Sequence, residues 1–367
     1  MSSEPPRKRG ALAGLSTVSA ALILLSAQVA LAQTPTIELE AGMEADSNPE
    51  RAEGTDTAGG LLGRYFLRID GVGVSGRSQQ LSAGFRSGGK FYESHGSEDT
   101  LINALQARWT VLPLTEWDAR WLFVYASASA KDRTEKGHRR DYFRAQAGAG
   151  LGVELGALTL HTGAAQGRFL YKPDGRLSNS GPSFDAGASW RIAEEWTLDL
   201  GATRALRDYR TVRFVETTRS GGEVLADGDG TLRRDRAIFL SGGLSYRGPV
   251  IVDAVGTWYA NDSNSYGQSL VRLGGALTLT SPLFAGLYGS VRLGLQRTQY
   301  ADPIFLDETL AVDDDNRNTL VLELARNLVD SVGVVLRYSL YAQEFGTRDT
   351  DYARQLFFVG LSWEQLP

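Results

Sequence analysis

The chain has 367 residues, of which 42% are hydrophobic, and its 38 Lys and Arg against 43 Asp and Glu give a formal net charge of −5. It contains no cysteine, which excludes a disulfide framework, a thiolate metal site and a cysteine nucleophile. The mild acidity gives no support for nucleic-acid binding, so we expect no nucleic-acid partner.

The N-terminus has the pattern of a secretory signal. Arg7, Lys8 and Arg9 precede an apolar, small-residue stretch over residues 11–27, and Ala30-Leu31-Ala32 forms a cleavage pattern. We therefore predict that residues 1–32 are a cleavable signal peptide and that residues 33–367 form a single domain. An N-terminal membrane anchor is the alternative, but the strongest apolar core is short for a bilayer span.

After this segment, no apolar run approaches the roughly 20 residues that a membrane-spanning helix needs. Small or apolar residues instead alternate with polar ones in segments of about 10 to 16 residues, which is typical of tilted strands in a membrane barrel. In chain order, the predicted strands begin near Thr36, Gly63, Gln79, Thr100, Glu116, Asp141, Leu158, Gly181, Trp196, Arg236, Val250, Gly267, Leu283, Asn316, Val332 and Arg354.

The last of these segments shows the alternation most clearly. One parity is large and apolar, while the other passes through Gly360 and Ser362 and cannot face a second hydrophobic layer. A strand with one face toward lipid and the other toward a polar lumen has this pattern. The residues that we expect to face lipid are Phe357, Val359, Leu361 and Trp363.

The connections between the predicted strands alternate in length. Short ones carry turn residues: Gly76-Arg77-Ser78, Leu112-Pro113-Leu114-Thr115, Ala193-Glu194-Glu195, Gly248-Pro249, Ser281-Pro282 and Asp330-Ser331. Long polar ones lie between them: Asp46 to Gly60, Glu93 to Asp99, Lys131 to Arg140, Lys172 to Ser180, Arg207 to Asp235, Ala301 to Asp315 and Glu344 to Tyr352. This alternation is typical of an outer-membrane barrel, with short periplasmic turns and long external loops.

Aromatic residues cluster at both ends of the predicted strands. Tryptophans lie near the short turns, at Trp109, Trp117, Trp190, Trp196 and Trp363. Tyrosines lie near the long connections, at Tyr92, Tyr142, Tyr171, Tyr259, Tyr266, Tyr300 and Tyr341. Amphipathic rings favour the two membrane interfaces, so we interpret the two groups as girdles; aromatic enrichment in strands is the simpler alternative.

These patterns predict an all-β fold, a transmembrane antiparallel β-barrel of about 16 strands, with 14 to 18 admissible. We expect it in the outer membrane of a Gram-negative bacterium, with both termini in the periplasm. Its expected partners are outer-membrane lipid, lipopolysaccharide and the barrel-assembly machinery. The basic segment from Lys131 to Arg140 is a candidate contact for anionic lipopolysaccharide, or an ordinary solvated loop.

If the apolar parity faces lipid, charged residues of both signs line the lumen, because an Arg on the lipid face costs roughly 2 to 4 kcal/mol near the bilayer midplane. The lumen-lining candidates are Glu38, Glu40, Glu44, Arg64, Arg68, Arg86, Lys90, Arg108, Arg120, Arg144, Asp185, Arg191, Asp199, Arg272, Arg292, Glu323 and Arg337. Two interpretations stay open: these residues line a hydrated path for a polar or anionic solute, or they form salt bridges that stiffen the barrel and partly plug it.

Two short motifs carry a family resemblance. Asp46-Ser47-Asn48 ends the first predicted strand, and the same three residue types recur as Asp262-Ser263-Asn264 where a later strand enters a long loop. The last predicted hairpin runs from Tyr338-Ser339 to the strand that contains Arg354. Turn formation alone explains each motif. Together with the strand pattern, the chain resembles outer-membrane β-barrel porin families, some of them associated with exopolysaccharide export. The resemblance implies a channel, with periplasmic polysaccharide-export proteins as expected partners.

Enzymatic patterns are sparse. His95, His138 and His161 lack paired ligand spacing, and no Gly-x-Ser-x-Gly elbow is present. The acidic run 313–315 is a candidate divalent-cation loop, but a solvated loop tip is the favoured explanation. We therefore predict no enzyme, no catalytic or metal site and no cofactor; a barrel-embedded hydrolase that uses His161 is the remaining enzymatic alternative.

The leading functional hypothesis is passage of a polar solute or polymer, most of all in polysaccharide export. A general diffusion porin is one alternative. A structural or interaction barrel of an envelope adhesion or motility complex, with a plugged lumen, is the other.

Overall fold

In the computed structural model, alternating polar and apolar residues form extended strands for almost the whole length of the chain. The structure describes residues 35–49, 59–75, 78–112, 122–138, 140–218, 224–302, 318–343 and 352–365. The predicted signal peptide, residues 1–32, lies outside the described residues. Within them, no helix is long and apolar enough to cross a membrane; two short 3-10 helices, η1 (Gly96–Glu98) and η2 (Gly175–Leu177), lie in loops.

The strands are β1 (Thr36–Asp46), β2 (Gly60–Ser75), β3 (Gln79–Tyr92), β4 (Thr100–Val111), β5 (Leu122–Glu135), β6 (Tyr142–Leu155), β7 (Leu158–Tyr171), β8 (Asn179–Arg191), β9 (Trp196–Thr218), β10 (Val224–Arg247), β11 (Ile251–Ser263), β12 (Leu270–Pro282), β13 (Leu287–Tyr300), β14 (Asn318–Val329), β15 (Val332–Gln343) and β16 (Tyr352–Gln365).

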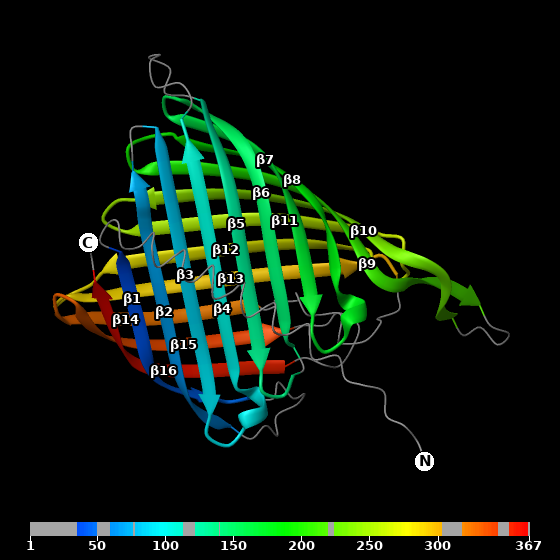
Figure 1. Ribbon diagram of the computed structural model, residues 1–367. Helices are drawn as coiled ribbons and strands as arrows, with labels where there is room; N and C mark the ends of the chain where they lie inside the picture. The colour runs from blue at the N-terminus through cyan, green and yellow to red at the C-terminus, as the bar shows by residue number, and fades with distance from the viewer. Residues whose placement is uncertain are drawn as a thin grey trace.

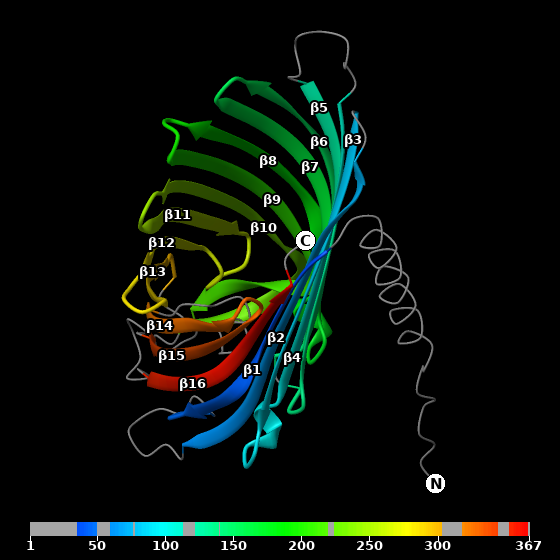
Figure 2. The ribbon, with the colours of Figure 1, turned by 90° about the vertical axis from the view of Figure 1, so that its left-hand side faces the viewer.

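Each strand pairs antiparallel with its neighbours in the chain, and β16 pairs with β1, so the sheet closes into a barrel. In Figure 1 the strands of the front wall cross those of the back wall steeply, and Figure 2 shows β16 beside β1 at the closing pair. The predicted fold class, a barrel of antiparallel strands, is confirmed, and the number of strands is the predicted one.

The pairing registers determine the dimensions of the barrel. A path that follows paired positions from strand to strand returns to β1 about 20 residues from its start, which is the shear of the barrel. With this number of strands, such a shear corresponds to a tilt of about 40° and a backbone diameter of about 30 Å. Side chains alone do not fill an interior of that width.

The outer face of the barrel is apolar. Leu273, Leu295 and Leu361, which point outward, are 56%, 55% and 57% exposed. Charged side chains on this face lie toward the long-connection ends of the strands or beside a short turn; among the described residues they include Asp132, Arg168, Arg204, Arg297 and Arg326. A broad exposed apolar surface of this kind requires lipid rather than water around it.

Trp109, Trp190, Trp196 and Trp363 are all exposed on the outer face near short turns. The predicted tyrosine girdle is wrong, because the inward parity includes Tyr92, Tyr142, Tyr171, Tyr259, Tyr300 and Tyr341. The β6–β7, β8–β9, β10–β11, β12–β13 and β14–β15 connections are tight, with two to four residues between the strands. The β6–β7 turn, which the sequence analysis did not identify, uses Gly156 at φ +64°, a conformation that favours glycine. Trp117, the turn near Pro113 and the acidic run 313–315 lie outside the described residues.

Two predicted loops are wrong. The segment from Arg207 to Asp235 is not a long loop, because β9 and β10 continue through its described residues as a hairpin that extends past both neighbouring strands. The segment from Lys131 to Arg140 is only partly loop, because β5 continues to Glu135. In both segments, charged residues occupy both faces of the strand and the ladder still continues through them, so a high charge content did not interrupt it.

Candidate functional site: the inner face of the barrel

The pairing registers place the lumen-lining candidates on one face of the wall, because residues directly opposite in an antiparallel pair share a face. On this face Glu38 pairs with Arg68, Arg68 with Arg86, Ser82 with Arg108 and Glu323 with Arg337. The same register relation includes Glu40, Glu44, Arg64, Lys90, Arg144, Asp185, Arg191, Asp199, Arg272 and Arg292. Arg120 lies outside the described residues.

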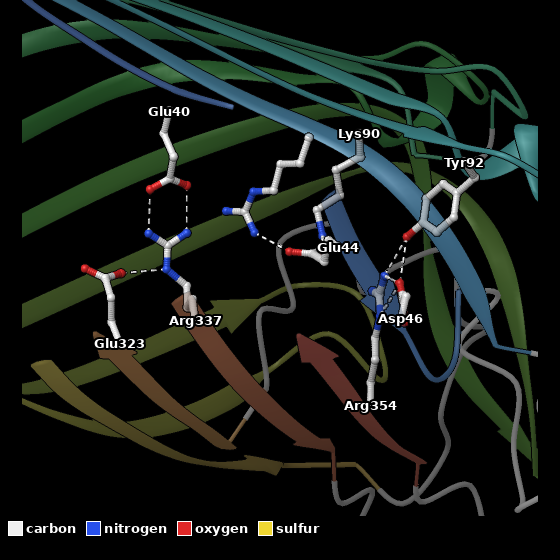
Figure 3. A network of polar contacts seen from close by, with 9 residues as sticks. Glu40, Glu44, Asp46, Lys90, Tyr92, Glu323, Arg337 and Arg354 are labelled. Atoms are coloured by element: carbon white, nitrogen blue, oxygen red, sulfur yellow. Dashed lines mark hydrogen bonds and ion pairs between the residues drawn. The ribbon is translucent and has the colours of Figure 1, made fainter. Parts of the chain in front are cut away.

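A buried contact joins Asp46 of β1 to Arg354 of β16 and Tyr92 of β3. The Arg354 guanidinium donates to both oxygens of Asp46 and to the Tyr92 hydroxyl at 2.8 Å. The Tyr92 hydroxyl donates to Asp46 Oδ2 at 2.8 Å, and the backbone N–H of Asn48 donates to Asp46 Oδ1 at 3.0 Å. Asp46 lies between the other two in Figure 3. The carboxylate therefore loses its water but gains partners at both oxygens.

Glu44 forms the second contact, one inward position along β1. Its side chain is 1% exposed and accepts from Arg64 of β2 and Lys90 of β3, each at 2.6 Å. Two cations around one carboxylate leave a net positive charge at this point of the wall. Charge-assisted hydrogen bonds of this length offset the cost of burying the ions.

Arg337 of β15 forms the third contact and lies between two carboxylates (Figure 3). It binds both oxygens of Glu40 on β1, at 2.8 and 2.7 Å, and donates from Nε to Glu323 of β14 at 2.6 Å. The buried ring of Phe358 lies between Arg337 and Arg64, whose guanidinium carbons are 5.4 and 5.7 Å from the ring centroid. The planar guanidinium suits this bidentate geometry, which a lysine cannot reproduce.

Together these three contacts, which we call the seam network, connect strands β14, β15, β16, β1, β2 and β3 around the closing pair. Each bond joins strands at most three positions apart, so the network follows the wall rather than crossing the lumen. For these residues the geometry favours the interpretation that salt bridges stiffen the barrel. They do not plug a barrel that is about 30 Å wide.

The inner face is not uniformly polar, contrary to the simplest form of the sequence prediction. In β16 the inward parity includes Leu356 and Phe358, which are 3% and 1% exposed. Phe66 and Phe239 share the inward face in β2 and β10. Apolar side chains are accommodated there where long charged side chains cover them, as Arg64 and Arg337 cover Phe358.

Two further charge clusters lie at the long-connection end. Arg140 donates to Glu98 of η1 at 2.6 Å and to the buried Glu135 of β5 at 3.0 Å, which joins two neighbouring loops. At the base of the long hairpin, Asp235 accepts from Ser263 at 2.6 Å and Asn261 at 3.1 Å, and also pairs with Arg233. These contacts fix loop bases to the barrel.

Sequence reasoning missed three inward charged residues, two of them in the seam network. Asp46 was treated only as a turn former, although its position in β1 also has inward parity. Arg354 was placed at the start of a strand without a face, yet counting from Phe357 puts it on the inward parity. Lys131 was assigned to a loop. Extending the alternation by one or two residues at each strand end would have found all three.

The histidines lie apart. His95 Nδ1 lies 3.0 Å from Ser94 Oγ, and His138 Nδ1 lies 2.8 Å from Asp141 Oδ2. His161 lies in β7, directly opposite Gly187 of β8. Within the ranges that the structure describes, no group of three or more His, Asp or Glu residues is arranged to hold a metal ion.

Comparison with known proteins finds no matching family model and no matching curated protein. Solved structures that are similar include a bacterial polysaccharide outer membrane secretin, with a TM-score of 0.44, 10% identity, and 90% of this chain and 98% of that chain covered. A mutant of the Rh. blastica porin has a TM-score of 0.39 at 11% identity, covering 90% and 99%. A mutant of the TodX monoaromatic hydrocarbon channel has 0.38 at 12%, covering 94% and 93%. At these scores the fold assignment rests on the strand pairing of this chain itself.

Proposed function

We propose that the chain is an outer-membrane channel through which a polar solute or polymer passes. The observation that carries this proposal is the opposite chemistry of the two faces of one closed barrel: apolar side chains outside, and charged side chains of both signs inside. A barrel about 30 Å across, whose seam network follows the wall, has space for water along its axis.

The finer proposal is that the solute is a polysaccharide on its way out of the cell. Its support is the resemblance carried by Asp46-Ser47-Asn48 and by the last hairpin, together with the width of the lumen. A general diffusion porin would have the same barrel geometry, so it is the second candidate. The two differ in what the cell loses when the protein is absent.

The channel itself is tested by reconstitution. The purified barrel is added to planar lipid bilayers in potassium chloride at about 1 M, which suppresses surface-charge effects. It is expected to produce discrete and stable conductance steps. A folded barrel, identified by the heat-sensitive mobility of its band in detergent gels, that never conducts at any voltage would contradict the channel proposal.

Export is tested in the cell that makes the protein. Deletion of the gene is expected to abolish surface polysaccharide while polymer accumulates in the periplasm, and a plasmid copy should restore it. Unchanged surface polysaccharide with slower uptake of small sugars would support the general diffusion porin instead.

A further inference from the structure

The inner face of β3 to β6 carries a row of cations that differs from the seam network. In the register, Arg86 of β3 is opposite Ala104, Ala104 is opposite Lys131 of β5, and Lys131 is opposite Arg144 of β6. All these positions share the inward face, because directly opposite residues do so. We call Arg86, Lys131 and Arg144 the cation row; Arg108 adds a fourth charge four residues from Ala104 along β4.

Carboxylates do not neutralise this row. Among the residues that the structure describes, Arg86, Arg108, Lys131 and Arg144 form no ion pair, whereas Arg64, Lys90, Arg337 and Arg354 each do. Arg108 instead lies 4.1 Å from the centroid of the Tyr125 ring, and Lys131 Nζ lies 5.6 Å from that of Tyr142. A ring face attracts a cation but leaves its charge in place.

The four side chains are exposed, so they face water in the lumen. Lys131 and Arg144 stand directly opposite each other, an arrangement that destabilises a sheet when both residues carry the same charge. Nothing in the folding of the strands requires this pair, since Ala and Gly occupy equivalent inward positions nearby, such as Ala104 and Gly148. An anion that binds between the cations would offset the repulsion.

The direction of the row indicates an extended anion. Strands about 4.8 Å apart place its ends, on β3 and β6, about 14 Å apart. Because the strands are tilted by about 40°, a row at right angles to them rises about 9 Å along the barrel axis. Several charges at increasing depth suit a polymer with repeated acidic groups better than a single small anion.

The wall across the lumen leaves room for such a polymer. Strands β11 to β14 lie half a turn of the barrel away from β3 to β6. The inward positions of that wall include small residues without charge, such as Thr257, Gly274, Ala276 and Gly294, beside the charged Arg272, Arg292 and Glu323. Where the small residues lie, a chain held against the cation row would meet little obstruction from the opposite side.

We propose that the cation row binds the carboxylate or sulfate groups of an acidic polysaccharide and makes the lumen selective for anions. This inference rests on the proposed channel function, and it names the class of substrate. The acidic groups would bind in succession to Arg86, Lys131 and Arg144, and arginine would contribute paired donors to each oxyanion.

The first test is ion selectivity in planar bilayers under a potassium chloride gradient. The wild-type reversal potential is expected to show preference for chloride, and the triple variant Arg86→Gln/Lys131→Gln/Arg144→Gln should shift it toward potassium. The matched control is Arg168→Gln/Arg204→Gln/Arg297→Gln, which removes the same charge from the outer face. Because neutral residues relieve repulsion in the row, the first triple should fold at least as well.

The second test uses oligogalacturonate as the acidic probe and a neutral maltooligosaccharide of similar length. Oligogalacturonate should interrupt the wild-type current, with an affinity that falls by at least about tenfold in the cation-row triple and stays unchanged in the outer-face triple. Equal block of all three proteins, or block by the neutral sugar alone, would overturn the cation row while leaving the channel intact. Folded protein that never conducts would instead overturn the channel itself.

Discussion

Asp46 and Arg354 represent one of two ways in which this barrel holds inward charges. Their side chains are 0% and 7% exposed, and they bind each other and Tyr92, so neither ion is left without a partner. Arg86 and Arg144 represent the other, since they are exposed to the lumen. A buried charge depends on its partner, whereas an exposed one depends on water.

This difference predicts an asymmetric response to mutation. Arg354→Gln leaves the Asp46 carboxylate buried without its counter-ion, so we expect it to lower the free energy of unfolding by about 3 to 5 kcal/mol. The double variant Arg354→Gln/Asp46→Asn removes both charges and should be less destabilised than Arg354→Gln. The measurement is urea-induced unfolding of the barrel in lipid vesicles, followed by tryptophan fluorescence.

The control is Arg234→Gln, which removes an exposed ion pair with Asp208 at 3.3 Å and should cost about 0 to 1 kcal/mol. If Arg354→Gln were no more harmful than Arg234→Gln, the buried contact would not stabilise the closing strands.

A second residue-scale prediction concerns the two faces of one hairpin. Leu293 of β13 points outward near the middle of its strand, so Leu293→Arg should cost about 2 to 4 kcal/mol in the bilayer. Ala276 of β12 points inward beside Gly294, and Ala276→Arg should be far less costly because water surrounds the new charge. Refolding into vesicles measures both, and equal costs would contradict the assignment of faces.

The sequence predicted faces for the charged residues but not their partners. Alternation in β14 and β15 placed Glu323 and Arg337 inward, because polar and apolar residues cannot exchange faces without a large cost. The contact of Arg337 with Glu40 depends on β16 lying between β15 and β1 and on the register of both pairs. Such registers are properties of the closed sheet, and no local pattern encodes them.

At the scale of elements, β9 and β10 depart furthest from the sequence prediction. The polar segment from Arg207 to Asp235, which contains Asp227, Gly228, Asp229 and Gly230, was predicted to be a long connection, yet strand pairing continues to Thr218 and Val224. Register shifts between Gly228 and Arg234 absorb these residues without ending the ladder. Gly and Asp are found at such irregularities as well as in turns, so composition alone does not distinguish the two.

The extended part of the β9–β10 hairpin is expected to contribute little to the stability of the barrel. Among the described residues, β9 has no pairing with β8 beyond Tyr209, and the pairing of β10 with β11 begins only at Asp235. Replacing residues 216–226 with Asn-Gly keeps Val215 opposite Asp227 and should change the free energy of unfolding by less than about 0.5 kcal/mol. Single-channel conductance should also stay unchanged, because the hairpin extends away from the wall (Figure 1).

A contrasting variant tests the base of the same hairpin. Asp235→Ala removes the acceptor of Ser263, Asn261 and Arg233, and leaves the buried Arg233 guanidinium without its carboxylate. This variant should be destabilised by about 3 kcal/mol or more. A larger effect from the shortened hairpin than from Asp235→Ala would show that the extension itself supports the barrel.

For the whole molecule, two arrangements that the sequence predicted independently occur together. The sequence predicted an even number of strands and connections that alternate in length. In a closed antiparallel barrel with an even number of strands, the start of β1, the end of β16 and the short turns all lie at the same end. The sequence could not predict the shear of about 20, because it follows from the sum of all pairing registers. The shear in turn sets the width on which the channel proposal depends.

The orientation of the barrel in the membrane is the last prediction, and the absence of cysteine makes it simple to test. Ala157 lies in the short β6–β7 turn, and Arg176 lies in η2 within the connection between β7 and β8. If short turns face the periplasm, a membrane-impermeant maleimide added to intact cells should label Arg176→Cys but not Ala157→Cys. Permeabilising the outer membrane should then expose Ala157→Cys to the same reagent, since the turn is exposed. The wild-type chain provides the unlabelled control. The reverse pattern of labelling would place the short turns outside the cell, and the substrate would then meet the cation row from the opposite direction.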